Sequence, residues 1–236
     1  MKLLIQGLKK SFEQKEVLKN IDFQFEEGKI YGLLGRNGAG KTTLFNCLNE
    51  DVEVDEGSFF MEDNSKRRAI EASDIGYVLS VPVVPEFLTG REFLKFFIDI
   101  NHDHIKDLKS IDDYFDMMRI DKEDRDRLMK DYSHGMKNKL QMLVNIIANP
   151  KVLLLDEPLT SFDIVVSEEM KQILREIKKD HIIIFSTHIM ELALDLCDEL
   201  VVLNNGVLEE IKKENLTNET MKEKIITLLK GESNGE

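Results

Sequence analysis

Two short stretches of the chain combine residue types that could do chemistry together. The first, GRNGAGKT from Gly35 to Thr42, fits the pattern G-x-x-x-x-G-K-[S/T] without a mismatch. In such a loop the glycines let backbone N–H groups surround phosphates, the Lys41 ammonium neutralises the β- and γ-oxygens, and the Thr42 hydroxyl can bind Mg²⁺. A Gly-rich turn before a helix is the alternative interpretation. We expect a nucleotide-binding loop made of Gly35, Arg36, Asn37, Gly38, Ala39, Gly40, Lys41, Thr42 and Thr43.

The second stretch, VLLLDEPLTSFD from Val152 to Asp163, places apolar residues directly before an Asp–Glu pair. An acidic pair after an apolar run is usually a solvated strand end. In a protein with a phosphate-binding loop, however, the neighbouring strand ends in an acid that holds Mg²⁺, usually through water. Asp156 fits that role, and Glu157 could orient and deprotonate an attacking water. The second acid therefore points towards nucleotide hydrolysis.

Alternating strands and helices are predicted to position both stretches. In IDFQFEEG the apolar residues fall on one face, which predicts a half-buried antiparallel strand, and KIYGLLG before the glycine loop indicates a buried strand. The residues after that loop, KTTLFNCLNE, carry a helical apolar stripe. Further along we expect a helix from about Met136 to Ala148, a strand at VLLLD, a helix around EEMKQILREIKK, a strand at IIIFS, a helix at IMELALDL and a strand at ELVVL. This alternation predicts an α/β fold with a largely parallel sheet covered on both faces.

Two regions depart from the alternation. From Thr89 to about Asp131 the chain shows charged helical patterns, REFLKFFIDI, IDDYFDMM and DKEDRDRLMK, which indicate an inserted helical subdomain. Past Gly206 we expect a short strand, an amphipathic helix around TMKEKIITLLK and a frayed polar tail, GESNGE. The two cysteines, Cys47 and Cys197, have no paired spacing, which favours core positions over a disulfide or a zinc site.

Composition narrows the class of function. The 236 residues carry a net charge of −13, which argues against broad binding to a nucleic-acid backbone but not against a nucleotide held by backbone amides. No apolar run approaches the ~18 residues needed to span a bilayer, and no cleavage-site pattern follows the N-terminal MKLLIQGLKKSF. We expect a cytoplasmic protein that binds no nucleic acid.

From Leu3 to about Glu210, the motifs resemble those of the nucleotide-binding subunit of an ABC transporter. YSHGMKNKL is similar to the family's signature loop, with Ser133 and Gly135 at the positions that contact the γ-phosphate of the partner subunit's ATP. TSFD, ending in Asp163, resembles the D-loop, and His188 in IFSTHIMEL corresponds to the switch histidine that touches the γ-phosphate. Phe12 matches the aromatic residue that stacks on adenine.

These residues also have simpler interpretations. Phe12 could be a core aromatic, His188 a structural histidine and Ser133 a helix N-cap. The order of the motifs along the chain is more specific than any single motif, and this order favours the family.

The resemblance implies an α/β P-loop NTPase fold of the ABC type, with a mixed central sheet, an antiparallel β subdomain and an inserted α-helical subdomain. The single expected domain, 1–236, divides into a P-loop core with the β subdomain (1–86 and 132–210), the helical subdomain (87–131) and a C-terminal helix with a polar tail (211–236).

The resemblance also implies ligands and partners. ATP and Mg²⁺ are expected, with Glu157 and His188 as catalytic residues and Thr42, Asp156 and Ser80 at the metal. Two cassettes, identical or different, are expected to dimerise around ATP and to drive a separate transmembrane permease subunit at the cytoplasmic face of the membrane. Export of a peptide, drug or lipid is the expected direction.

Three features depart from the family's commonest pattern. His134 and Met136 replace a glycine and a glutamine of the signature loop, a variation that resembles exporters whose membrane domain is a separate chain. LTSFD replaces TSGLD, and Ser80 in IGYVLSVP stands where the family normally has glutamine. Because that glutamine contacts Mg²⁺ and links the site to the membrane subunit, Ser80 bears on coupling more than on nucleotide binding.

Two other functions fit parts of the pattern. One is a soluble, non-transport ABC ATPase that remodels a ribosome or a nucleic-acid complex, although such proteins usually carry two cassettes or long coiled coils. The other is an unrelated P-loop GTPase or kinase, which the signature loop and His188 disfavour.

Overall fold

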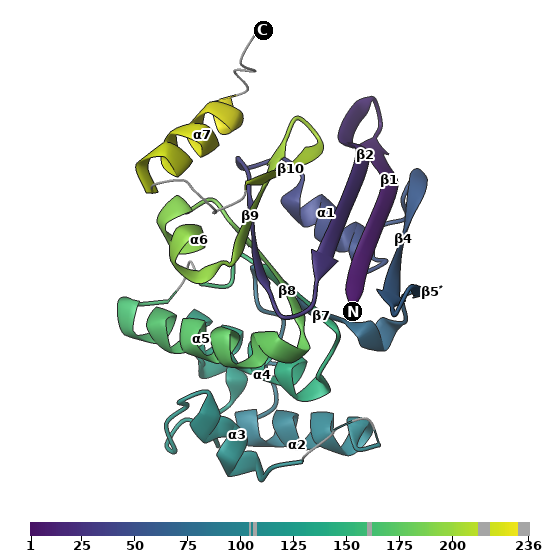
Figure 1. Cartoon of the computed structure of the whole chain (residues 1–236). Coiled ribbons are helices and arrows are strands. Elements are labelled where there is room, and N and C mark those ends of the chain that lie inside the picture. The colour runs from purple at the N-terminus through teal and green to yellow at the C-terminus, as the bar shows by residue number, and fades with distance from the viewer. Residues whose placement is uncertain (104, 106–107, 160–161, 212–217, 231–236) are drawn as a thin grey trace, which may run out of the picture.

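The computed structural model describes residues 1–103, 105, 108–159, 162–211 and 218–230 (Figure 1). Within them the chain builds a six-stranded sheet in the order β10-β9-β3-β8-β7-β6. All neighbouring strands pair in parallel except β10, which is antiparallel to β9, so the central sheet is mixed as the sequence predicts. Its strands are β3 Ile30–Leu34, β6 Ile75–Val78, β7 Val152–Asp156, β8 Ile182–Thr187, β9 Glu199–Asn204 and β10 Val207–Ile211.

A second sheet is antiparallel, with the order β2-β1-β4-β5. The alternation predicted in IDFQFE lies in β2, where Ile21 and Phe25 are buried and Asp22 is exposed. Sequence patterns identified only β2 of this sheet. In β1 three consecutive residues are buried and the pairing with β2 shifts register after Ile5, next to Gly7 with φ of +60°, so no simple alternation survives. The strands are β1 Lys2–Phe12, β2 Lys15–Glu26, β4 Glu56–Asp63 and β5 Lys66–Arg68.

Helices cover both faces of the central sheet, as predicted. Helix α1 Lys41–Leu48 shares one hydrophobic core with both sheets, in which Leu44 and Phe45 pack with residues of β1, β2 and β3. The opposite face of the sheet packs against α4 His134–Ala148, α5 Ile164–Ile177 and α6 Met190–Leu196. Cys47 and Cys197 are buried in these two cores, which confirms the positions expected for them.

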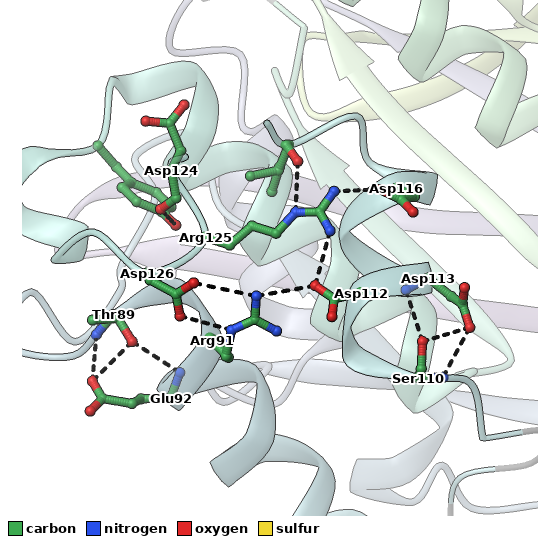
Figure 2. A network of polar contacts seen from close by, with 12 residues as sticks. Thr89, Arg91, Glu92, Ser110, Asp112, Asp113, Asp116, Asp124, Arg125 and Asp126 are labelled. Carbon is green, nitrogen blue, oxygen red and sulfur yellow. Dashed lines mark hydrogen bonds and ion pairs between the residues drawn. The ribbon is translucent and has the colours of Figure 1, made fainter. Parts of the chain in front are cut away.

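The helical region lies between β6 and β7 in the chain and at one end of the molecule (Figure 1). Its helices, α2 Gly90–Asn101 and α3 Ile111–Met117, each begin with a capping box (Figure 2). The third helix predicted in DKEDRDRLMK is wrong, because residues 122–126 form consecutive turns and only η2, Met129–Asp131, makes a short 3-10 turn. Two features account for the turns. The buried Arg125 pairs with aspartates of α3, and the aspartates of the segment itself compete with the helical backbone for hydrogen bonds.

The C-terminal part of the described chain is the helix α7 Asn218–Lys230, whose Ile225 is fully buried. The predicted polar tail, 231–236, lies outside the described residues. Among the helices that the structure describes, none has the length and apolar character needed to cross a membrane. The division into a core, a helical subdomain over 87–131 and a C-terminal segment stays a prediction.

Candidate functional site

A cavity of about 860 Å³ beside the glycine-rich loop gathers most of the predicted site residues. It is bounded by the turn between β1 and β2, the loop before α1, the end of β7, and Ser80, which lies two residues after β6. Three further residues also line it, Glu13, Lys15 and Val17, to which no sequence pattern pointed. The predicted residues brought together here are Phe12, Asn37, Gly38, Gly40, Lys41, Thr42, Thr43, Ser80, Asp156 and Glu157.

Phe12 stands at the end of β1 and at one side of this cavity. Its surface is 47% exposed, so the interpretation of Phe12 as a core aromatic is wrong. The ammonium of Lys10 lies 5.3 Å from the centre of the Phe12 ring, and Asp55 holds that ammonium at 2.9 Å. An exposed ring beside a cavity offers a face on which a flat base can stack.

The glycine-rich loop follows β3 and leads into α1. Gly38 and Gly40 have φ of +79° and +108°, a backbone conformation that residues with a Cβ rarely adopt. A Cβ at Gly40 would also approach a methyl group of Val17 to 2.8 Å. Arg36 and Ala39 do not line the main cavity; they line a neighbouring cavity of about 420 Å³.

The side chain of Lys41 is folded back into this loop. Its Nζ donates to the carbonyl of Gly35 at 2.9 Å and to that of Arg36 at 3.3 Å. The residue is only 6% exposed. Burial lowers the pKa of Lys41, while the negative charges of Glu157 and Asp156 oppose that shift. The loop therefore holds a desolvated cation that an incoming anionic group can satisfy.

Asp156 is the last residue of β7, and each of its carboxylate oxygens accepts a hydrogen bond. Thr42 Oγ1 donates to Oδ2 at 2.8 Å, and Ser186 Oγ donates to Oδ1 at 2.5 Å. Ser80 is exposed and lines the same cavity. Carboxylate and hydroxyl oxygens are hard ligands of the kind that Mg²⁺ prefers. The donor chemistry of Thr42, Asp156 and Ser80 therefore fits a magnesium site.

Glu157 and His188 contact each other at the ends of β7 and β8. Oε1 of Glu157 lies 3.0 Å from Nδ1 of His188, and both side chains are partly exposed. Glu157 has φ of +49°, an uncommon value for a residue with a Cβ, and its N–H donates to the carbonyl and the hydroxyl of Ser186 at 3.2 and 3.1 Å. The two predicted catalytic residues thus form one pair, and only Glu157 lines the cavity.

The residues predicted from the signature loop and the D-loop meet in a different cavity. Ser133, Gly135 and Asp163 line a space of about 350 Å³ that shares no lining residue with the main cavity. Ser133 is the N-cap of α4 and Asp163 that of α5, so the N-cap interpretation of Ser133 is correct. Thr160 and Ser161 of TSFD lie outside the described residues.

The sequence matches a family in the region that builds this geometry. A family model described as ABC transporter matches residues 18–160. The chain is also 33% identical over 218 residues to the ABC transporter ATP-binding protein YdbJ of Bacillus subtilis, which covers 90% of this chain and 68% of that protein. The chain belongs to the ABC transporter ATPases. As a member of this family it is an ATP-binding ATPase subunit.

Solved cassettes share the fold of this ABC ATPase. The ATP binding subunit of an ABC transporter matches with a TM-score of 0.80 at 21% identity, covering 96% of this chain and 100% of that one. The cassette MJ0796, solved as a dimer in a post-hydrolysis state bound to ADP and Pi, matches with a TM-score of 0.76 at 17% identity, covering 91% and 100%. This likeness confirms the predicted α/β cassette architecture.

Sequence reasoning also missed Ser186, which contacts the acidic residues of the ABC ATPase site. This fully buried serine contacts Asp156, the last residue of β7, through a side-chain bond, and it accepts two bonds from the backbone N–H of Glu157, the next residue. The sequence contained a signal for this residue, because the strand predicted at IIIFS is apolar except for its last residue, Ser186. What the sequence could not supply is the register that places Ser186 opposite Asp156.

Proposed function

We propose that two cassettes close around ATP and that hydrolysis drives a separate transmembrane permease subunit. The observation that carries this proposal is the separation of the two cavities, since Lys41 lies in one and Ser133 in the other. A second cassette that brings its Ser133 cavity to the Lys41 cavity would complete a site for ATP. MJ0796, a cassette of the same fold, was solved as a dimer bound to ADP and Pi, which supports a dimeric arrangement.

In the proposed site the glycine-rich loop binds the phosphates. Backbone N–H groups at Gly38 and Gly40 and the ammonium of Lys41 replace the water that surrounds the β- and γ-oxygens. The Lys41 ammonium then exchanges its bonds to the loop carbonyls for bonds to phosphate. Phe12 stacks on the base at the other end of the cavity.

Glu157 serves as the general base for the attacking water in this proposal. Its backbone N–H bonds to Ser186 hold the Glu157 backbone beside the end of β7, and His188 lies within hydrogen-bond distance of the carboxylate. When Mg²⁺ is bound at Thr42, Asp156 and Ser80, it neutralises charge on the phosphates. Thr42 and Asp156 already lie together in the cavity, 2.8 Å apart.

Transport is the proposed purpose of this hydrolysis. We place the dimer at the cytoplasmic face of the membrane, bound to a permease, and we propose export of a peptide, drug or lipid. The direction rests on the signature loop, in which His134 and Met136 resemble the variants found in exporters with a separate membrane chain.

Membrane fractionation tests the proposal. A tagged chain at native abundance is expected to sediment with membranes and to co-purify in detergent with a multi-spanning protein. ATP-dependent uptake of cargo into inside-out vesicles would support export. Co-sedimentation with ribosomes, or a chain that stays in the supernatant with no membrane protein attached, would contradict the transport function and leave the ATPase assignment intact.

A further inference from the structure

A buried tyrosine directly precedes Ser133 and is tied to the helical region. Tyr132 is 5% exposed, and its hydroxyl donates to the backbone carbonyl of Asp124 at 2.7 Å. Its ring belongs to the core that includes α2, α3 and α4. Because Ser133 is the next residue and caps α4, the bond from Tyr132 restrains the backbone that presents the Ser133 side chain.

The turn that carries Asp124 is itself anchored by Arg125, as Figure 2 shows. Arg125 is 3% exposed, and its Nε donates to the carbonyl of Ile120 at 3.0 Å. Its guanidinium also pairs with Asp112 at 3.0 Å and with Asp116, both on α3. A guanidinium is a rigid fork of donors, so these acceptors fix the side chain and hold the turn against α3.

Helix α2 holds the same turn from a second direction (Figure 2). Arg91 pairs with Asp126 at 2.8 Å and with Asp112 at 3.1 Å, and its backbone N–H donates to the carbonyl of Arg125 at 2.9 Å. Asp112 therefore links both arginines. The Asp124 carbonyl that accepts from Tyr132 therefore lies in a turn that is held by contacts with both α2 and α3.

A glycine leaves the space that the Tyr132 hydroxyl occupies. A Cβ added at Gly90, the first residue of α2, would overlap Tyr132 Oη, and its next contact with the ring would be at 3.2 Å. Gly90 does not have positive φ, so its backbone does not require glycine. Glycine at position 90 therefore leaves room for the Tyr132 hydroxyl, which a larger residue would displace.

We propose that Tyr132 is a positioning residue for ATP hydrolysis, which holds Ser133 in place for the ATP bound by the partner subunit, with Arg125 securing the turn that Tyr132 bonds. This inference rests on the proposed function, in which Ser133 acts across the dimer. Neither Tyr132 nor Arg125 lines the cavity around Lys41, so a defect here leaves ATP binding by the same chain intact.

The Tyr132→Phe variant tests this role, because it keeps the buried ring and removes only the hydroxyl. Loss of one hydrogen bond that aligns Ser133 is expected to lower kcat by about 3- to 10-fold. The dissociation constant of a fluorescent ATP analogue on the isolated chain should not change. The matched control is Tyr114→Phe, because Tyr114 is also 5% exposed and its hydroxyl accepts from the backbone N–H of Lys109 at 3.2 Å. Equal kcat values for the two variants would overturn the proposal.

Mixing experiments show on which side of the dimer the defect acts. Tyr132→Phe mixed with Lys41→Ala forms heterodimers in which the intact loop of the first chain faces the intact Ser133 of the second. The mixture should exceed the summed activities of its components, as should Ser133→Ala mixed with Lys41→Ala. Rescue of Ser133→Ala without rescue of Tyr132→Phe would overturn the positioning role. An unchanged kcat in Ser133→Ala would overturn the proposed shared site and this inference with it.

A second variant tests the same contact from the α2 side. Gly90→Ala should displace the Tyr132 hydroxyl and lower kcat. In the Tyr132→Phe background the alanine Cβ meets the ring at 3.2 Å and the carbonyl oxygen of Arg125 at 3.3 Å, without the overlap with the hydroxyl, and should add little to the loss of kcat. Thermal melting checks that all variants are folded. Independent, multiplicative losses of kcat from Gly90→Ala and Tyr132→Phe would contradict the proposal.

Discussion

Ser186 and Asp156 face each other across β8 and β7, with the serine hydroxyl 2.5 Å from Oδ1 of the carboxylate. The Thr42 hydroxyl donates to the other carboxylate oxygen, Oδ2, so two hydrogen bonds set the orientation of the Asp156 side chain. The same serine receives the backbone N–H of Glu157. One buried hydroxyl therefore aligns the two acids that the proposed hydrolysis needs.

Ser186→Ala should lower the ATPase rate by about 10-fold or more, because residues that orient metal-binding groups typically have effects of this size. It should also raise the Mg²⁺ concentration needed for half-maximal activity. Thr187→Val is the matched control, since Thr187 is equally buried on β8 but donates no described bond to Asp156. Similar losses of unfolding free energy with similar losses of activity in the two variants would contradict a specific role for Ser186.

Lys41→Ala should weaken ATP binding by about 100-fold or more, since hydrogen bonds to charged groups contribute roughly 1.5–3 kcal/mol each. Equilibrium titration with a fluorescent ATP analogue measures the change. Lys179→Ala, at a side chain that is 78% exposed, is the control for loss of a positive charge. Near-normal affinity in Lys41→Ala would count against the phosphate-binding loop.

The strands and helices of the P-loop core were predictable because their patterns are local. KIYGLLG and VLLLD are short apolar runs next to glycines or acids, and the structure has them as the fully buried β3 and β7. The antiparallel sheet was predictable only in part, since the shifted register near Gly7 hides the alternation of β1.

The features that the sequence did not predict depend on contacts between residues far apart in the chain. DKEDRDRLMK has a helix-like composition, but in the structure most of it forms turns, from which Arg125 pairs with Asp112 and Asp116 on α3. Likewise Ser186 becomes a site residue through its strand partner, and Ser133 is separated from the Lys41 cavity by the fold of a single chain. The order of the motifs was enough to predict the family. The strand register beside Asp156 and the partners of the buried Arg125 could be found only from the structure.

Glu157→Gln should keep ATP binding and lower hydrolysis by about 100-fold or more, because the amide cannot accept a proton from water. The trapped ATP should hold the chain as a dimer, seen as a doubling of mass by light scattering after gel filtration. Glu176→Gln on α5 is a control that leaves the site unchanged. A Glu157→Gln chain that hydrolyses ATP at a rate close to the unmodified one would exclude Glu157 as the general base.

Ser80 lines the main cavity and begins the connection to the helical region. From it, the segment with Pro82 and Pro85 leads to Glu86, whose carbonyl accepts from the backbone of Lys130 at 3.1 Å and whose carboxylate pairs with Lys137 of α4 at 2.7 Å. These contacts join the segment that follows Ser80 to the chain on both sides of Ser133.

Serine is about two bonds shorter than the glutamine usual at this position, so a bridging water is needed to reach the metal or the attacking water. We expect this to make hydrolysis slow in the isolated chain and to leave stimulation to the membrane partner. Ser80→Gln should therefore raise the partner-free ATPase rate several-fold, with ATP affinity nearly unchanged, whereas Ser80→Ala should not. Steady-state rates with and without the co-purified permease measure both effects. If Ser80→Gln leaves both rates unchanged, a neighbouring residue or water already replaces the glutamine, and the serine has no part in coupling.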